Sequence, residues 1–258
     1  MLFRSLLNTQ IKGSSRLYGR IALATDIFDA LEVGRSRVDE LNISPVECTR
    51  QYTAIVDAHI AVIFEAVDAM VEPAVSRLLL ALFNLIEGKE YAGLERANGV
   101  RFLASEHAEL TDQQTLASLI ERQEQSLARF ETFCGDDIRT QWLALQSTLP
   151  LPEFERLRRQ LLSPNPMLSK ALIGSWFDIC TVRIDEFHRV EQHLTDRIKE
   201  ACRERITETE ATLVAQRESL ELSDEWVTGT KPGTLEPKDH TQRLSSRLNR
   251  TLMDLLQQ

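Results

Sequence analysis

An all-α fold of two helical bundles in series is predicted by three properties of the sequence. Long windows repeat their apolar residues every three or four positions, the period of one helix face, and no segment alternates convincingly as a strand does. The 258 residues include only 10 Gly and 8 Pro, few for a sheet protein of this length. Long helices with short loops on both sides of residue 135 predict two four-helix-bundle-like halves in series, residues 1–135 and 136–258.

The N-terminal half is predicted to contain four helices. An apolar stripe marks the first over residues 18–41, and the Ser-Pro pair at 44–45 is the N-cap and first-turn signature of the second. The second stripe stops before Pro73, which can begin a third helix but would break the interior of one. The sequence TDQQ at 111–114 is expected to cap the fourth helix, which ends near Gly135.

The C-terminal half is predicted to be built around one long helix. A short apolar helix over residues 138–145 and two proline-rich turns precede it, and the long helix covers at least residues 175–206. Residues 223–240 are polar and rich in turn formers, which indicates a linker before a final amphipathic helix at 241–258.

Charge and cysteine usage exclude several classes of protein. A formal net charge of −9 argues against a general surface that binds nucleic acid or an anionic membrane. No apolar run approaches the roughly 20 residues that cross a bilayer, and the apolar start of the chain is too short for a signal peptide. The four cysteines are far apart, as expected for reduced thiols. We therefore expect a cytoplasmic protein without a membrane partner.

Catalysis and metal binding are not predicted. The five histidines lack the two Glu-x-x-His pairs and two further glutamates that a di-iron bundle needs. No nucleophile stands beside a base, and no phosphate-binding loop is present in the sequence. We expect no enzyme activity, no catalytic residues, no cofactor and no metal.

Two arginines lie on apolar helix stripes. Arg96 follows Leu82 and Ile86 on one helix face, and Arg183 lies on the stripe of the long helix. A buried guanidinium needs a negative partner, because it loses its hydration and keeps its charge. A carboxylate from a neighbouring helix is one such partner, and a small planar oxyanion that matches the fork of donors is the other. The spacing of the residues does not decide between a carboxylate partner and an oxyanion ligand.

Three glycines surround Arg96 in the sequence. Gly88 and Gly99 are expected to permit close helix contact, and Gly93, on the face of Arg96, is a further candidate for lining an anion site. Trp176 and Phe177 are expected to seal the core near Arg183.

The sequences of both arginine segments resemble the paired signatures of the NIT family, the nitrate- and nitrite-sensing domain of bacterial regulators. The first signature is a Gly-Lys-Glu, Ala-Gly and Glu-Arg-Ala run, and the second is a Trp-Phe and Arg-Ile-Asp run. The matching residues are Gly88, Lys89, Glu90, Ala92, Gly93, Glu95, Arg96 and Ala97, followed by Trp176, Phe177, Arg183, Ile184 and Asp185.

This resemblance extends from about residue 37 to residue 258 and implies an all-α fold of two stacked bundles. It also implies that nitrate or nitrite binds among arginines between helices, a role that it carries onto Arg96 and Arg183. The expected protein is a sensory domain in nitrate-responsive transcriptional regulation, including antitermination and nitrate assimilation, that signals by helix rearrangement. We also expect it to form a homodimer.

The N-terminus departs from the family pattern. Relatives begin with a Gln-x-Glu-Arg-Gly-x-Ser type signature, often with two adjacent arginines that contact the anion. The most similar sequence here is TQIKGSSRLYGR. The site is either rebuilt from Lys12, Arg16 and Arg20 or these residues occupy a solvated helix face. In the second case the chain is a NIT-like scaffold for dimerisation or partner docking that does not sense anions.

The C-terminus departs as well. Many relatives continue into an ANTAR domain, a small RNA-binding module, whereas this sequence stops where a linker to that module would begin. Its last helix carries a basic stripe of three arginines, for which a solvated face is the simpler interpretation. We therefore expect no direct RNA binding and an output protein or domain in trans.

Overall fold

The structure is a computed structural model that describes residues 2–164 and 166–228, with side chains over 15–164 and 166–220. Every regular element within these ranges is helical, which confirms the predicted all-α class. The elements are α1 (Leu2–Asp29), α2 (Leu31–Asp39), α3 (Pro45–Ala69), α4 (Pro73–Ser105), α5 (Leu110–Phe133), α6 (Asp136–Thr148), α7 (Leu151–Leu161), the 3₁₀ turn η1 (Lys170–Leu172) and α8 (Ile173–Thr228).

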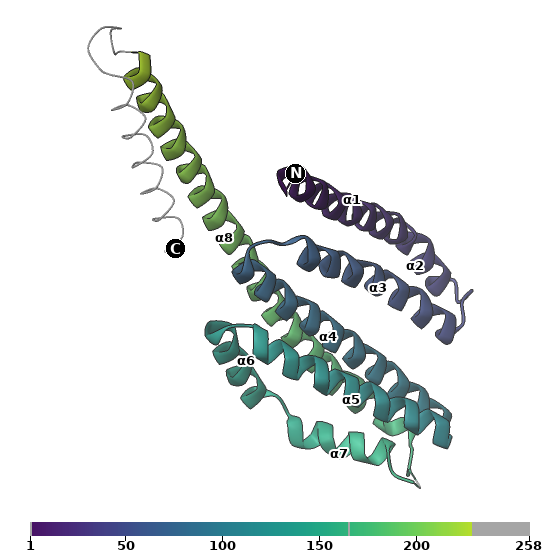
Figure 1. Ribbon diagram of the computed structural model, residues 1–258. Coiled ribbons are helices and arrows are strands. Elements are labelled where there is room, and N and C mark those ends of the chain that lie inside the picture. Colours follow the sequence, from purple (N-terminus) through teal and green to yellow (C-terminus); the bar gives the residue numbers. More distant parts are fainter. Residues whose placement is uncertain (1, 165, 229–258) are drawn as a thin grey trace. The chain divides into compact units, whose positions relative to one another are not determined.

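The chain divides into two compact units, Met1–Arg203 and Glu204–Gln258. In the first unit α3 lies between α1 and α4, and α5 packs along the other side of α4 (Figure 1). Helix α8 is 56 residues long and begins in the first unit. None of the helices within the described ranges is long and apolar enough to cross a membrane.

The predicted start of the second helix is confirmed. The Ser44 hydroxyl accepts a hydrogen bond from the Glu47 backbone N–H at 3.2 Å, and Pro45 occupies the first turn of α3. The single helix predicted over residues 18–41 is instead two, because the chain is interrupted at Ala30 between α1 and α2.

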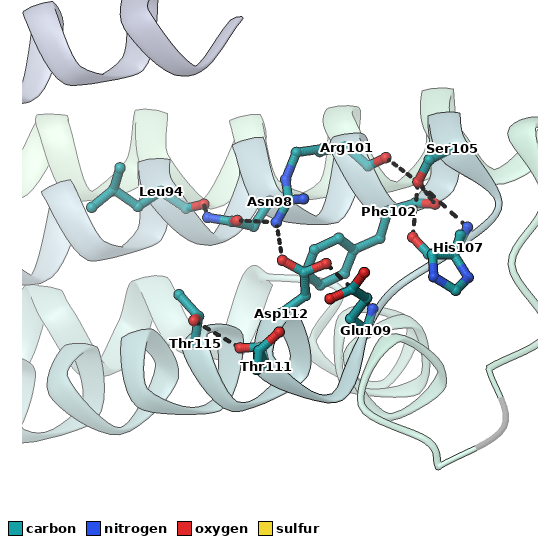
Figure 2. Close-up of polar contacts among 10 residues, drawn as sticks. All are labelled: Leu94, Asn98, Arg101, Phe102, Ser105, His107, Glu109, Thr111, Asp112 and Thr115. Carbon is teal, nitrogen blue, oxygen red and sulfur yellow. Dashed lines mark hydrogen bonds and ion pairs between the residues drawn. The ribbon is translucent and has the colours of Figure 1, made fainter.

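The turn from α4 to α5 is built from side-chain caps (Figure 2). Glu106, with φ of 52°, ends α4 in the left-handed region. Glu109 caps α5 and exchanges hydrogen bonds with Asp112, whose carboxylate also accepts from Arg101 at 2.7 Å. The predicted cap at Thr111 is therefore wrong by two residues, because the Glu109 side chain provides the acceptor two residues earlier.

Two hydrophobic clusters hold α4 and α5 against α8, one including α6 and the other including α7. In the first cluster Phe130 and Trp142 stack edge to face with ring centroids 5.3 Å apart. The predicted halves, residues 1–135 and 136–258, share this core. Of the predicted linker at 223–240, residues up to Thr228 are helical in α8, and the predicted final helix at 241–258 lies outside the described residues.

Two glycines of α4 bring neighbouring helices close. A Cβ placed on Gly88 would lie 2.9 Å from Leu127 of α5, and one placed on Gly99 would lie 2.2 Å from Nε1 of Trp176 in α8. Both positions confirm the expected close helix contact, since no side chain larger than hydrogen fits there without movement.

The layer formed by α1, α2 and α3 is packed much less tightly than the rest of the first unit. Between residues 15 and 72 only Ala24 and Glu65 are buried, whereas α4 alone buries residues along its whole length. The space that this layer leaves against α4 and α8 is a large cavity.

Candidate anion site

The large cavity has a volume of about 730 Å³ and is bounded by α1, α3, α4 and α8. Most of its wall is aliphatic or aromatic, and a few charged side chains interrupt that wall. The charged residues at its wall are Lys89, Glu90, Arg96 and Glu191. A cavity of this size and character is typical of sites for small ligands.

Arg96 is half-buried and reaches the cavity from α4. Its Nη1 donates to Thr181 Oγ1 at 2.8 Å, and its guanidinium carbon lies 4.8 Å from the centre of the Phe177 ring. The Thr181 hydroxyl donates to the Phe177 carbonyl at 2.7 Å, so a lone pair of this neutral oxygen accepts the hydrogen bond from Arg96. Among the described side chains, no carboxylate lies within 4.0 Å of this guanidinium.

The backbone around Arg96 is fixed by the α8 tryptophan. Trp176 is fully buried, and its Nε1 donates to the Arg96 carbonyl at 3.0 Å. This contact requires the bare backbone of Gly99, one turn further along α4. The predicted sealing role of Trp176 is confirmed by its burial, whereas Phe177 is 46% exposed and lies against the guanidinium instead.

The other charged side chains of the cavity wall have polar partners. Lys89 forms an ion pair with Glu191 of α8. Glu90 accepts a hydrogen bond from Thr53 at 2.8 Å, and its burial raises the pKa of its carboxyl above the ordinary glutamate value. Arg96 is therefore the cation among the described wall residues whose charge no acid neutralises.

Arg183 lines a different and smaller cavity of about 310 Å³, bounded by α5, α6, α7 and α8. Its guanidinium lies between the rings of Phe154 and Phe187, 4.8 and 4.9 Å from their centres. Burial lowers the pKa of Arg183 to about 10, and the nearby Glu95 carboxylate, 3.9 Å away, opposes this shift only in part. The two arginines onto which the resemblance carries anion binding, Arg96 and Arg183, thus line separate cavities.

Glu95 is the centre of a buried charge network that sequence reasoning missed. It is 1% exposed and accepts two hydrogen bonds from Arg158 of α7, Nε to Oε1 at 2.7 Å and Nη2 to Oε2 at 2.9 Å. Gln123 of α5 donates to the same carboxylate at 3.0 Å. Burial opposes the charge of Arg158, but the Glu95 carboxylate outweighs it and raises the pKa of the guanidinium.

A sequence signal for this network exists. Glu95 lies on the buried stripe of α4 between Ala92 and Gly99, and Arg158 lies beside Leu157 on the buried face of α7. An acid and a base on two buried stripes indicate a pair, but helix period does not say which helices are neighbours.

Two of the three N-terminal candidates, Arg16 and Arg20, lie away from Arg96. Arg16 donates to Glu65 at 2.9 Å and Arg20 approaches the same carboxylate at 3.8 Å, so both are held by α3. Phe64, next to Glu65, packs on Phe83 of α4. Phe83 precedes Arg96 by thirteen residues, which is about 20 Å along the helix. Lys12 lies in α1, and its side chain is outside the described range.

Gly93 lines the large cavity one turn before Arg96, as its position on the same helix face predicts. A Cβ placed there would meet no atom within 4 Å. Gly93 and Arg96 are the sequence candidates that the fold brings to one cavity.

The described part of the chain contains no group of three or more His, Cys, Asp or Glu side chains arranged to hold a metal ion. What the site offers is an uncompensated guanidinium at the wall of a mostly apolar cavity between helices. An unpaired guanidinium of this kind is suited to a small anion, and a cavity between helices is typical of helical ligand-binding domains.

The chain belongs to the family described as nitrate and nitrite sensing (NIT), which matches residues 3–199. It is 29% identical over 184 residues to the nitrate regulatory protein of Klebsiella oxytoca, a match that covers 70% of this chain and 46% of that protein. The structure of the NasR transcription antiterminator is similar with a TM-score of 0.67 and 27% identity, covering 72% of this chain and 51% of the other. The chain spans about half the length of these relatives, which are regulators.

Proposed function

We propose that this chain is the sensory part of a nitrate-responsive regulator and that nitrate or nitrite binds at Arg96 in the large cavity. The observation that carries this proposal is the guanidinium of Arg96, which meets a neutral hydroxyl and an aromatic ring but no carboxylate among the described side chains. A planar oxyanion supplies the missing charge and accepts paired N–H donors. Gly93 leaves room for it.

Arg183 acts in this proposal through α8. Besides the Lys89–Glu191 ion pair and the Trp176 hydrogen bond, two polar contacts join α4 and α8. The first is Arg96 with Thr181 on the side of the large cavity, and the second is Glu95 with Arg183 beside the smaller one. An anion that draws Arg96 away from Thr181 weakens the first link and leaves the second, so α8 gains a preference for another rotation or register.

The ligand shifts that equilibrium only by its differential affinity for the two arrangements, and a 100-fold preference supplies about 2.7 kcal/mol. Helix α8 continues beyond Arg203 to Thr228, so a rotation within the first unit is passed on to an output domain or protein.

The same helix supports the proposed homodimer. In the part of α8 after Arg203, Ile206, Leu213 and Leu220 recur every seven residues and are 58%, 59% and 69% exposed. These residues supply one of the two apolar positions of a coiled-coil heptad, and they form an exposed stripe that is suited to contact with a second copy.

Titration calorimetry of nitrate, nitrite and chloride tests the proposal. Arg96→Gln keeps an N–H donor for Thr181 and removes the charge, so it is expected to abolish nitrate binding while the circular dichroism spectrum is unchanged. Arg156→Ala is the matched control, because this exposed arginine pairs only locally with Glu153. Nitrate binding of equal strength in wild type and Arg96→Gln would refute the site.

The second candidate function is a scaffold that does not sense anions. It is favoured by Arg16 and Arg20, which pair with Glu65 rather than reach the large cavity. Absence of heat and of thermal stabilisation at millimolar nitrate in the wild-type protein, together with an intact dimer, would select this function.

A further inference from the structure

We propose that the large cavity takes an organic monocarboxylate with an apolar body, whose carboxylate binds Arg96 and whose body lies along the aliphatic wall. This inference rests on the proposed function only in taking Arg96 as the anion-binding group. It concerns the rest of the cavity, which a four-atom oxyanion at Arg96 leaves unfilled.

The volume of the cavity is the first reason. At about 730 Å³ it falls in the middle of the range of roughly 300–1,000 Å³ that organic ligands of drug size occupy. Nitrate or nitrite uses only a small end of such a space. The cavity opens to solvent and is large enough to hold water, so a ligand that fills it is favoured by the apolar surface that it and the wall remove from water.

The shape of the cavity is the second reason. On α4 its wall extends from Ile86 to Arg96, a distance of about 15 Å along the helix. The contacts between α3 and α4 run antiparallel, with Phe64 against Phe83 and Thr53 against Glu90. The α3 wall residue Ile63 therefore lies toward the Ile86 end, away from Arg96. The site is elongated, with a cation at one end.

The chemistry of the wall is the third reason. Ile21 and Phe28 of α1, Ile55 and Ile63 of α3, and Ile86 of α4 present apolar surface to the cavity. Each methylene that a ligand buries there contributes about 0.8 kcal/mol, which is about fourfold in affinity. The wall thus favours a body of carbon and hydrogen.

The charges of the wall select one carboxylate rather than two. Lys89 is already paired with Glu191, and Glu90 stands six residues, or about 9 Å, before Arg96. A second carboxylate on the ligand would approach these two acids and be repelled. A neutral tail meets no such penalty, so a monocarboxylate fits the site and a dicarboxylate does not.

The test is a calorimetric series of acetate, butanoate, hexanoate and octanoate against the full chain, with octanamide as the uncharged analogue. Affinity is expected to rise with each methylene, by up to about fourfold, and octanoate is expected to compete with nitrate. Octanamide and Arg96→Gln should each lose at least tenfold in affinity relative to octanoate on wild type.

Cavity-filling variants separate this inference from nitrate binding. Ile63→Trp fills the end of the cavity remote from Arg96 and is expected to weaken octanoate at least tenfold while acetate and nitrate bind as before. Tyr52→Trp is the matched control, since this residue is exposed on the same helix and does not line the cavity. Should Ile63→Trp fail to fold by circular dichroism, Ala24→Leu of α1 makes the same test.

Nitrate binding without any gain from acetate to octanoate would overturn the inference and leave the proposed function standing. Octanoate binding that requires Arg96 and the open cavity, without nitrate binding, would support the inference and refute nitrate as the ligand. Equal binding of octanoate and octanamide, or equal binding to wild type and Ile63→Trp, would also overturn it.

Discussion

Two glycines of α4, six residues apart, are expected to respond to alanine in opposite directions. A Cβ on Gly99 would lie 2.2 Å from Trp176 Nε1 and 2.3 Å from its Cε2, and both distances are shorter than the contacts that a Cβ atom makes in real structures. The indole is fully buried beside Phe154, with ring centroids 5.8 Å apart. It is large and enclosed, so it moves away from α4 only by disturbing its neighbours. A Cβ on Gly93 would meet no atom within 4 Å.

The magnitude for Gly99→Ala has three parts. Overpacking of a core position costs about 1–3 kcal/mol. Displacing the indole lengthens its 3.0 Å hydrogen bond to the Arg96 carbonyl, and an unsatisfied buried donor costs about 1–3 kcal/mol. Alanine in a helix interior stabilises the folded state by about 0.5–1 kcal/mol relative to glycine. The net expected loss in the free energy of unfolding is about 1–5 kcal/mol.

For Gly93→Ala only the last of these effects remains, so the variant is expected to gain about 0.5–1 kcal/mol. Urea denaturation followed by circular dichroism measures both changes, and tryptophan fluorescence reports movement of the indole in Gly99→Ala. Equal stabilities of the two variants, or a loss in Gly93→Ala as large as that in Gly99→Ala, would refute the assignment of Gly99 as the contact glycine and of Gly93 as a cavity residue.

Three further predictions follow from the buried charges and from α8. Arg158→Met leaves Glu95 with Arg183 at 3.9 Å and is expected to cost about 3–5 kcal/mol, whereas Arg183→Met keeps the closer pair and should cost less than about 1.5 kcal/mol; equal losses in urea denaturation would contradict this ranking. Burial raises the pKa of Glu90, so its contribution to stability is full below its ordinary pKa of 4.5 and is lost as pH rises through the raised value. Glu90→Gln should therefore lose less stability than wild type between pH 4.5 and pH 7, and parallel pH profiles would count against it. Leu213→Lys is expected to shift a dimer toward monomer in sedimentation experiments, and an unchanged dimer would place the contact elsewhere.

The helical period of the sequence predicted part of the candidate site. It put Gly93 and Arg96 on one face of α4, and the fold brings both to the large cavity. It equally put Arg183 on an apolar stripe, and the side chain of this residue is 13% exposed. The helical period describes the faces of one helix and does not say which residues of two helices come together. Arg96 and Arg183 line separate cavities.

The sequence by itself determined the all-α class, the start of α3 at Ser44 and Pro45, and the need for glycine where α4 meets its neighbours, because these depend on contacts within a few residues or on a single helix face. Only the tertiary structure decided that Glu95 pairs with Arg158, 63 residues away, and that Arg96 receives a neutral hydroxyl from α8. Both outcomes depend on which helices pack side by side, and that choice is made by the summed burial of whole faces rather than by any local signal.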